Sequence, residues 1–529
     1  MNGTLFEGKN KTIYNNDTIN AGETERFMYF DKFFYEHLLR NHESSKHPLK
    51  ADLIIGNDWQ TGGISALMKL MPAVERYFGM NPEIADKIYN TPVLTIMHNA
   101  QYSGGVDHSQ TKLLNILFGE HSAIIAKNAW MPQHSNLKTD SLNGLFHGNT
   151  FNPQTMAASY SDTIIPVSKG YGKEMYSHSG FGEINHDIYR MRARVHEYNM
   201  DYIKYITEKS GLNPNDVKSE NISYRPITNG CDRVSNILTK KGAQELESSL
   251  KLPKNSLKVY NKGKVLDWHN HNKEVYLNKI KEEINIARNG GENPLKVALP
   301  EMTNLEGVTK NTMVIAYAGR ISDQKGFDIY EHAIEKFIDK HKEGDFMFYA
   351  QGEGDSELIK EFLELKKRIA NKYGEKIANR IVFSKHFSEK PRYNGCKLMS
   401  DFLVMPSWFE PCGLVHKENS TYSGAIAIVN KVGGLTEGLK NGENAIFSDY
   451  MPKFEDKNKA LEFNSNALAG AFGKAYEIFK DKENFGNLMT NSFLANHSWL
   501  NINGSIKEYA QLLVDLKILK PEILRHDLI

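Results

Sequence analysis

The sequence predicts an α/β protein with at least two domains built on parallel sheets. Short apolar runs recur along the chain, and each is followed by a small, polar or glycine-rich turn and then by a helix-like stretch. Strands that are buried on both faces have this composition, which is typical of parallel sheets covered by helices. The 529 residues exceed what one hydrophobic core usually serves, so we expect two or more domains.

Seven apolar runs are predicted to be strands. They are Leu53–Gly56, Val93–Met97, Thr163–Ser168, Met313–Gly319, Phe346–Ala350, Phe402–Pro406 and Ala425–Val429. In open α/β sheets, ligands bind just beyond the carboxyl ends of the strands. We therefore expect the functional residues directly after these runs.

A change of composition suggests where the domains divide. Between about 235 and 310 the chain is rich in Lys, Asn and Glu, and no strong strand signal occurs. We interpret this stretch as the end of a first domain and a connection. The predicted domains are 1–310 and 311–490, followed by a closing helical segment, 491–529, with an amphipathic pattern from Ile506 to Leu516.

Charge and cysteine content exclude several classes of protein. Lys plus Arg (65) nearly balances Asp plus Glu (64), so we expect no nucleic-acid or anionic-membrane surface. The sequence has neither a signal-peptide pattern nor an apolar run of about 18 residues, and we expect no membrane span. The three cysteines, Cys231, Cys396 and Cys412, lack metal-type spacing. These features predict a soluble, cytoplasmic protein with no metal site and no bound cofactor.

The first motif of interest, Gly319–Asp328, follows a predicted strand and opens a helix. Such a turn offers unpaired backbone N–H groups and the positive end of a helix dipole, which suit a phosphate group. Arg320 and Lys325 add two cations that can neutralise charge on a departing diphosphate. The alternative is an ordinary helix start with solvated cations.

A second motif, Met405–Leu414, follows the predicted strand that begins at Phe402. Glu410 lies in a turn with Pro411 and Gly413, and its carboxylate could bond sugar hydroxyls, as could the amides of Cys412, Gly413 and Leu414. The alternative is a helix N-terminal acid favoured by the dipole. Glu418 follows eight residues later, a spacing that could place both carboxylates on one helix face.

Three further segments carry polar residues beside apolar runs. Asp58 lies in Gly56–Gly62, His98 and Asn99 lie in Met97–Tyr102, and Asn229 lies in Ile227–Asp232. Taken alone, His98 after a buried strand favours a satisfied core histidine, and Asn229-Gly230 favours a simple turn. Their meaning depends on the other motifs.

Together and in this order, the motifs resemble the glycogen and starch synthase family. The family pattern runs H-D-W-H, T-x-H-N-x-x-Y-x-G, N-G-I-D, G-R-x-x-x-Q-K-G, P-S-R-F-E-P-C-G-L and T-G-G-L. The matching segments are Asn57–Gln60, Thr95–Gly104, Asn229–Asp232, Gly319–Gly326, Pro406–Leu414 and Val432–Leu435. The resemblance extends from about residue 20 to about 515.

The resemblance implies a GT-B fold, in which two Rossmann-like domains with parallel sheets face a central cleft and a C-terminal helix closes back. It implies an acceptor-side first domain and a second domain that binds the nucleotide-sugar. The family transfers glucose with retention from a nucleotide-sugar, ADP-glucose in bacteria and plants, to the non-reducing end of an α-1,4-glucan. The expected partners are therefore a nucleotide-sugar donor and an α-glucan acceptor. The choice between ADP and UDP stays open, as does a homo-oligomer or a complementing subunit.

The resemblance also implies roles for individual residues. Arg320 and Lys325 would hold the diphosphate, Glu410 would bind glucose and stabilise the transition state, and His98 would bond the glucose hydroxymethyl group. These four are the predicted catalytic residues. The predicted substrate-binding residues are Asp58, Asn99, Asn229, Gln324, Cys412, Gly413, Leu414, His386 and Phe387, of which one of the last two lies near the family's base-stacking aromatic position.

The chain departs from the family pattern mainly in its first domain. It has no K-x-G-G-L segment, so we expect the first sheet to lack the strand that this segment supplies. Asn152–Thr155 replaces a second family lysine, Asn57 and Gln60 replace the two histidines of H-D-W-H, and Trp408 replaces the arginine of P-S-R-F-E. Two alternatives to an active glucan synthase therefore remain. One is an impaired or non-catalytic paralogue or fragment that binds nucleotide or glucan, and the other is a GT-B transferase with a different acceptor.

Overall fold

The structure is a computed structural model, and it describes most of the chain. The described residues are 21–43, 51–100, 102–107, 109–128, 144–147, 150–177, 224–231, 239–385, 390–452, 456–500 and 504–525. The chain forms two compact units. Unit 1 combines residues up to 228 with those from 505 onward, and unit 2 comprises Asn229–Gly504.

Unit 2 is built on a parallel sheet of six strands in the order β11-β10-β9-β6-β7-β8. The strands are β6 (Met313–Ala318), β7 (Phe346–Gln351), β8 (Ile381–Ser384), β9 (Phe402–Met405), β10 (Ile426–Asn430) and β11 (Ala445–Ser448). All residues of β6 to β10 are buried, which explains why their sequences are continuous apolar runs.

The order of these strands creates a topological switch point. The chain runs outward from β6 through β7 to β8, then returns to the other side of β6 and runs outward again through β9, β10 and β11. Loops that follow two neighbouring strands diverge at such a point and leave a crevice at the carboxyl ends, where ligands bind in doubly wound folds. In unit 2 this point lies between β6 and β9.

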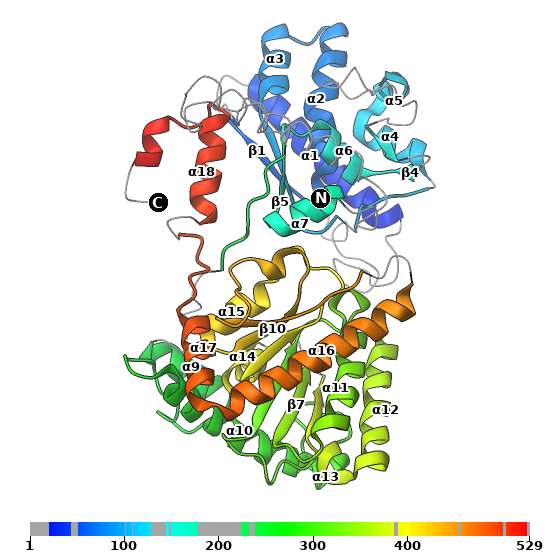
Figure 1. Cartoon of the computed structure of the whole chain (residues 1–529). Coiled ribbons are helices and arrows are strands. Elements are labelled where there is room, and N and C mark those ends of the chain that lie inside the picture. Colours follow the sequence, from blue (N-terminus) through cyan, green and yellow to red (C-terminus); the bar gives the residue numbers. More distant parts are fainter. Residues whose placement is uncertain are drawn as a thin grey trace, which may run out of the picture. The chain divides into compact units, whose positions relative to one another are not determined.

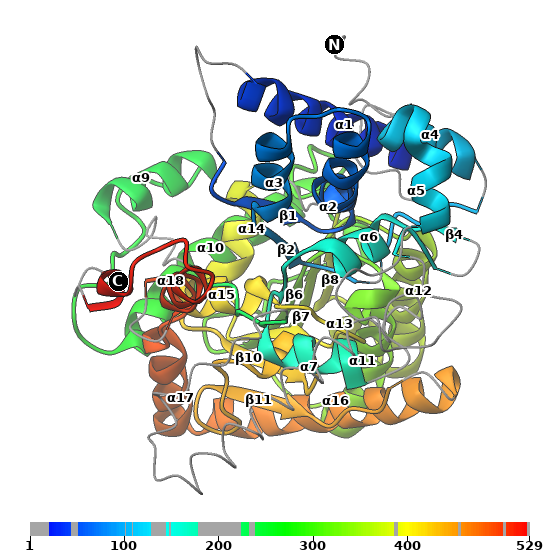
Figure 2. The same cartoon turned by 90° about the horizontal axis from the view of Figure 1, so that it is seen from above.

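Helices cover both faces of this sheet, as Figures 1 and 2 show. One group contains α11, α12 and α16, and the other contains α10, α14, α15 and α17. The helices of unit 2 are α9 (Lys240–Ser249), α10 (Val265–Arg288), α11 (Phe327–His341), α12 (Ser356–Tyr373), α13 (Glu375–Ala378), α14 (Lys390–Met399), α15 (Leu414–Ser423), α16 (Lys457–Lys480) and α17 (Lys482–Leu494), with short 3-10 helices at Pro300–Met302, Asp323–Lys325 and Gly433–Thr436.

The segment between 229 and 310 belongs to unit 2, so the boundary lies at 228/229 and not at 310. Its main element is α10, which packs on α14 and α17 and buries an apolar stripe that includes Trp268, Tyr276 and Ile280. The exposed face of α10 carries many of the Lys, Asn and Glu residues that dominate the composition. The polar composition of this stretch was interpreted as a connection between domains. The stretch instead contains an amphipathic helix that completes the core of unit 2.

A fully buried ionic network attaches α10 to the sheet. The carboxylate of Asp401, just before β9, accepts hydrogen bonds from Lys273 Nζ (2.5 Å) and His269 Nε2 (3.1 Å), both on α10. It also accepts from the Val314 amide of β6 (2.7 Å). Burial alone would raise the pKa of Asp401, but the charge of Lys273 and the bond from His269 lower it below its usual range.

A second buried lysine in unit 2 has a different environment. Lys366 of α12 is 1% exposed, and its Nζ donates to Thr303 Oγ1 (2.7 Å) and to the Ile381 carbonyl (2.8 Å). Burial lowers its pKa to about 7, against the opposing effect of Glu301. The unfolded chain has a lysine pKa near 10.4 and takes up a proton at a higher pH than the folded chain. The contribution of Lys366 to the free energy of unfolding is therefore largest above the unfolded pKa of about 10.4, and it falls as the pH decreases from there to about 7.

We expect Lys366→Met to remove this dependence. As the pH falls from about 10 to about 7, the free energy of unfolding of the Lys366→Met variant should rise relative to that of the wild type. Below about pH 7 the difference should stay constant. Urea unfolding at several pH values measures it. Lys367→Met is the control, because the Lys367 side chain is 47% exposed and pairs with Glu364. A difference that does not change with pH would contradict the assignment.

Unit 1 contains a parallel sheet in the order β1-β2-β5 among the described residues. Its strands are β1 (Ile54–Asn57), β2 (Val93–Met97) and β5 (Thr163–Pro166), with a small antiparallel pair, β3 (Phe146–His147) and β4 (Thr150–Phe151). Its helices are α1 (Ala21–Glu43), α2 (Gly62–Tyr77), α3 (Pro82–Asn90), α4 (Gln110–Phe118), α5 (Ser122–Asn128), α6 (Pro153–Tyr160), α7 (Lys169–Ser177) and α18 (Ser505–Asp515), with 3-10 helices at Trp59–Thr61, Gly119–His121 and Pro521–Arg525.

All seven predicted apolar runs contain strands of these two sheets. The prediction of a missing first strand depends on residues 1–20, which lie outside the described part of the chain. Among the described helices, none combines the length and apolar character needed to cross a bilayer.

The C-terminal helix α18 completes unit 1. Leu512 packs against Leu94, Ile165 and Ile227, which belong to or follow strands of the first sheet. Arg225 and Asp515 form an ion pair of 2.6 Å, and the Ser505 hydroxyl donates to the Thr228 carbonyl. The chain thus returns to its first unit after completing the second, so the predicted segment 491–529 is divided at 504/505.

Candidate active site

The motif after β6, Gly319–Asp328, and the motif after β9, Met405–Leu414, meet at the switch point of unit 2. Lys325 Nζ and Glu410 Oε2 are 2.6 Å apart, and the Trp408 amide donates to the Gln324 carbonyl (3.0 Å). Gly326 has φ 64°, and a Cβ there would lie 1.9 Å from the Pro406 carbonyl oxygen, so only glycine permits this approach. The two loops thus converge at the carboxyl ends of β6 and β9, directly after the predicted strands, where functional residues were expected.

Glu410 is fixed in the loop that precedes α15. Its side chain is 5% exposed, and Oε2 also accepts a hydrogen bond from Ser407 Oγ (3.1 Å). Because α15 begins at Leu414, Glu410 does not occupy the first turn of that helix, and the alternative of a helix N-terminal acid is wrong. Glu418 pairs instead with Lys397 (2.8 Å), and it is not part of the Lys325–Glu410 pair.

The loop after β6, Gly319–Gly326, is the turn predicted to suit a phosphate group, and we call it the phosphate-type loop. It holds Arg320 at the surface. Arg320 is exposed, and its Nη2 donates to Gln324 Oε1 (3.1 Å). Sequence reasoning missed Tyr317, whose hydroxyl donates to the Arg320 carbonyl (2.8 Å) and so fixes the backbone of this loop. Burial raises the pKa of Tyr317, and the charge of Glu410 raises it further, which keeps this hydroxyl protonated.

The amides predicted to bind sugar oxygens lie at the start of α15. Gly413 occupies the N-cap position with φ 72°, and no side chain caps this turn. The segment Val432–Leu435 supports the loop from behind, because the Gly434 amide donates to the Glu410 carbonyl (2.8 Å). A Cβ on Gly434 would lie 2.5 Å from the Cys412 Cα. The amino end of α15 therefore presents a positive dipole beside the carboxylate of Glu410.

Asn229 belongs to this cluster and not to the first-domain residues with which it was grouped. Its carbonyl accepts from Cys412 Sγ (3.8 Å) and from Lys417 Nζ (3.0 Å). Asn229 is the first residue of unit 2, whereas Asp58 and Asn99 lie in unit 1. The sequence offered no signal for this placement, because 183 residues separate Asn229 from Cys412.

A cavity of about 420 Å³ adjoins the phosphate-type loop. The loop after β7 forms one wall, and the Ile321 amide donates to the Glu353 carbonyl (2.9 Å), which joins it to the loop after β6. The residues that line it include Leu299, Gly352, Gly354, Ile359, Leu363 and Lys385. Its apolar side chains and its position suit a planar base. His386 and Phe387, predicted to lie near the base, are outside the described residues.

In unit 1, the predicted residues cluster at the carboxyl ends of β1 and β2. Asp58 Oδ1 accepts hydrogen bonds from the amides of His98 (2.5 Å) and Asn99 (3.1 Å). The His98 ring nitrogen Nε2 is 3.0 Å from Asn57 Oδ1. The His98 side chain is exposed, so the alternative of a satisfied core histidine is wrong.

The backbone at Asp58 is in an unfavourable conformation. Its φ is 53°, a left-handed value that a non-glycine residue seldom adopts. Burial raises the pKa of Asp58, while His98 and the two amides lower it. Strain of this kind is maintained only where surrounding contacts compensate for it, and it is common at functional sites. Asp58 thus determines the path of the His98–Asn99 backbone.

Two departures from the family pattern have structural roles. Asn152, which begins the segment that lacks the family's lysine, is fully buried and caps α6 by accepting from the Thr155 amide (2.9 Å). Trp408, in place of an arginine, is buried, and its Nε1 donates to Asp328 Oδ1 (3.0 Å) at the start of α11. Neither residue supplies a cation.

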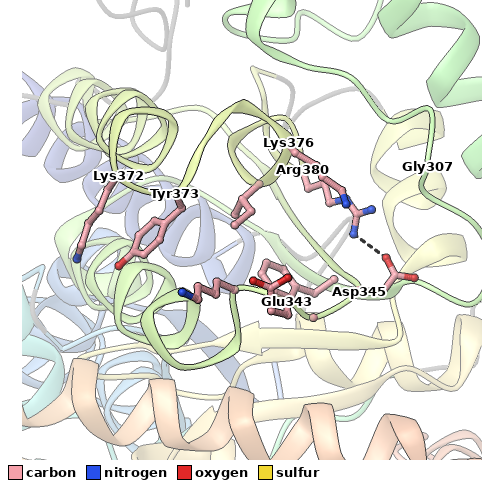
Figure 3. Close-up of a pocket in the computed structure, with 11 residues that line it drawn as sticks. Gly307, Glu343, Asp345, Lys372, Tyr373, Lys376 and Arg380 are labelled. Atoms are coloured by element: carbon pink, nitrogen blue, oxygen red, sulfur yellow. Dashed lines mark hydrogen bonds and ion pairs between the residues drawn. The ribbon is translucent and has the colours of Figure 1, made fainter.

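Figure 3 shows a different pocket, at the opposite end of the unit 2 sheet. It has a volume of about 550 Å³ and lies where β7 and β8 begin. Arg380 and Asp345 form an ion pair across it (2.6 Å), and most of its other charged side chains, such as Lys342 and Lys376, are exposed to solvent. None of the predicted site residues lines this pocket.

Known proteins that are similar to this chain include starch synthases and glycogen synthases. The family model described as the starch synthase catalytic domain matches residues 2–190. The catalytic domain of starch synthase IV from Arabidopsis thaliana, bound to ADP and acarbose, has a similar structure, with a TM-score of 0.59 and 18% identity over 96% of this chain and 80% of that chain. A glycogen synthase of Clostridium botulinum (strain Eklund 17B) is 26% identical over 93% of this chain and 78% of its own length. A glycogen synthase of Kosmotoga olearia is 30% identical over 44% of this chain and 43% of its own length.

The two units with their parallel sheets, and the likeness to starch synthase IV, define a GT-B fold. The predicted fold class is thus confirmed. Residues 2–190 resemble the starch synthase catalytic domain, and along most of its length the chain is similar to glycogen synthases.

Proposed function

We propose that the chain transfers glucose with retention from ADP-glucose or UDP-glucose to the non-reducing end of an α-1,4-glucan. The observation that carries this proposal is the pairing of Lys325 with Glu410 at the switch point of unit 2. A nucleotide-sugar has a diphosphate and a glucose group, and a neighbouring cation and carboxylate could bind one each. The cation would bind the diphosphate, and the carboxylate would bind glucose.

In this proposal, the residues of unit 2 bind the donor. Arg320 and Lys325 neutralise the diphosphate as it departs, and Gln324 orients Arg320. Glu410 and the amides of Cys412, Gly413 and Leu414 hold the glucose hydroxyls and stabilise the positive charge that develops at the anomeric carbon. The apolar cavity beside β7 takes the base, for which adenine is favoured because the structurally similar starch synthase IV is bound to ADP.

The residues of unit 1 would orient the sugar. His98 would bond the glucose hydroxymethyl group, and Asp58 would hold the backbone amides of His98 and Asn99 in place. Asp58 and Asn99 would also bind the sugar. The bond from the anomeric carbon to the diphosphate breaks, and the acceptor hydroxyl oxygen forms a bond to that carbon on the same face. The acceptor proton passes to the departing diphosphate. This scheme uses no divalent metal ion.

A second candidate function is nucleotide or glucan binding without efficient transfer. One observation favours it: Asn152 is buried as a helix cap where the family carries a lysine, so a cation expected from unit 1 is missing. Losing one preorganised charged contact costs on the order of 100- to 1000-fold in rate. The two candidates differ in turnover and share the binding of a nucleoside diphosphate.

The test is calorimetric titration with ADP and UDP. We expect ADP to bind the wild type, and Lys325→Ala to weaken binding by about 10- to 100-fold, the effect of losing one hydrogen bond to a charged group. Lys376→Ala is the matched control, because Lys376 lies at the opposite end of the same sheet (Figure 3).

The outcomes separate the candidates. Binding of ADP together with transfer of labelled glucose to glycogen supports the synthase. Binding without transfer supports the second candidate. Equal ADP affinity in the wild type and Lys325→Ala, or no binding of either nucleotide, would contradict both the synthase and nucleotide binding without transfer.

A further inference from the structure

A buried cation lies directly behind the proposed sugar-binding loop. Lys417, on the second turn of α15, is 3% exposed. Its Nζ donates to the Asn229 carbonyl (3.0 Å) and to Cys412 Sγ (3.6 Å). Within the described part of the chain, no carboxylate lies within ion-pair distance of this ammonium group. A buried charge of this kind is costly and persists only where it is fully engaged.

Two histidines near Lys417, His416 and His497, add no positive charge beside it. His416 is buried and His497 is half-buried, and their ring centroids are 6.1 Å apart. Burial, and to a smaller extent the charge of Lys417, lower the pKa of both rings, to about 4 for His497. Both rings are therefore neutral near pH 7. Lys417 and the positive end of α15 are then the sources of positive charge on this side of the loop.

Lys417 connects segments that are distant in sequence. Asn229 is the residue at which the chain enters unit 2, and 188 residues separate it from Lys417. The same segment is held from the other side, because the Cys231 amide donates to the His497 carbonyl (2.6 Å). A single ammonium group thus bonds both the entering segment and the first residue of the proposed amide trio.

We infer that Lys417 is a positioning residue for the donor sugar, whose buried ammonium group fixes the Cys412–Leu414 loop against the Asn229 carbonyl. This inference rests on the proposed function of that loop. Without the ammonium group, Cys412 loses a bond to its side chain, and the Asn229 carbonyl loses its charged donor. The loop amides then sample orientations that do not match the glucose hydroxyls. The diphosphate contacts of Arg320 and Lys325 stay intact.

The first test is hydrogen exchange of the variant Lys417→Met, resolved by peptide. Exchange in peptides that cover 411–415 and 228–231 should become at least about tenfold faster, because a hydrogen bond to a charged group is lost. Peptides covering β7 should exchange at the wild-type rate.

Lys397→Met is the matched control. Lys397 is a second buried lysine of unit 2, and it pairs with Glu418, the residue after Lys417. Its removal should leave exchange at 411–415 unchanged. Unchanged exchange at 411–415 in Lys417→Met, or an equal rise in β7, would overturn a local positioning role.

The second test separates positioning from stability by activity. In Lys417→Met, kcat/KM for ADP-glucose should fall about 10- to 100-fold, while the dissociation constant of ADP, which has no sugar, should change less than about threefold. An equal loss for ADP and ADP-glucose would overturn the inference. If the wild type transfers no glucose, the proposed function fails, while the exchange result still decides whether Lys417 fixes the loop.

Discussion

Replacing Glu410 by alanine is expected to lower glucosyl transfer by at least about 100-fold, the cost of losing one preorganised charged contact in the transition state. Glu410 is the carboxylate that the structure places beside Lys325, in a loop supported by Ser407 and Gly434. Its removal leaves the Lys325 ammonium group unpaired but 26% exposed, so water can solvate it. The fold should therefore persist while the chemistry fails.

The measurement is incorporation of labelled glucose from ADP-glucose into glycogen, with and without EDTA. The control is Glu418→Gln, because Glu418 pairs with Lys397 away from the Lys325–Glu410 pair. Undiminished transfer by Glu410→Ala would refute the assigned role, and activity that vanishes with EDTA would refute the metal-free scheme.

Replacing Asp401 by asparagine should be the most destabilising of the changes considered. The substitution removes the charge that compensates Lys273, and both side chains are fully buried. Breaking a buried pair by removing one partner costs about 3–5 kcal/mol of unfolding free energy, because the remaining charge stays in the core. Burial lowers the pKa of Lys273 even in the wild type.

Urea unfolding measures the effect, with Asp345→Asn as the control. Asp345 also pairs with a cation, Arg380, but its side chain is 51% exposed, and its loss should cost about 1 kcal/mol or less. The double variant Lys273→Met, Asp401→Asn should recover part of the lost stability, because no unpaired charge then stays buried. Equal losses for Asp401→Asn and Asp345→Asn would exclude a strong buried pair.

The strands were predictable because burial on both faces leaves a direct trace in the sequence. Each apolar run of the two parallel sheets became a strand, and the motifs after β6 and β9 met where the strand order reverses. Strands β8 and β11 were missed, although each carries three apolar residues, as many as the predicted run Leu53–Gly56. Short runs of this kind occur in helices and loops as often as in strands.

Other features could not be predicted because they depend on contacts between distant segments. The Lys417–Asn229 bond joins residues 188 apart, and neither residue type indicates the other. The buried polar residues of α10, His269, Asn272 and Lys273, interrupt its apolar stripe and hid a core helix in a polar composition. They are buried because Asp401 and the backbone bind them.

The return of the chain to unit 1 has a consequence for synthesis. The ribosome makes residues in order, so all of Asn229–Gly504 is made before Ser505–Asp515 can cover Leu94 and Ile165. At a synthesis rate of roughly 5–20 residues per second, this apolar face of the first sheet stays uncovered for on the order of 15–60 s. During that time unit 2 can fold as a contiguous segment, whereas unit 1 is an incomplete domain. Until α18 is made, the apolar face that includes Leu94 and Ile165 is exposed to association with other chains.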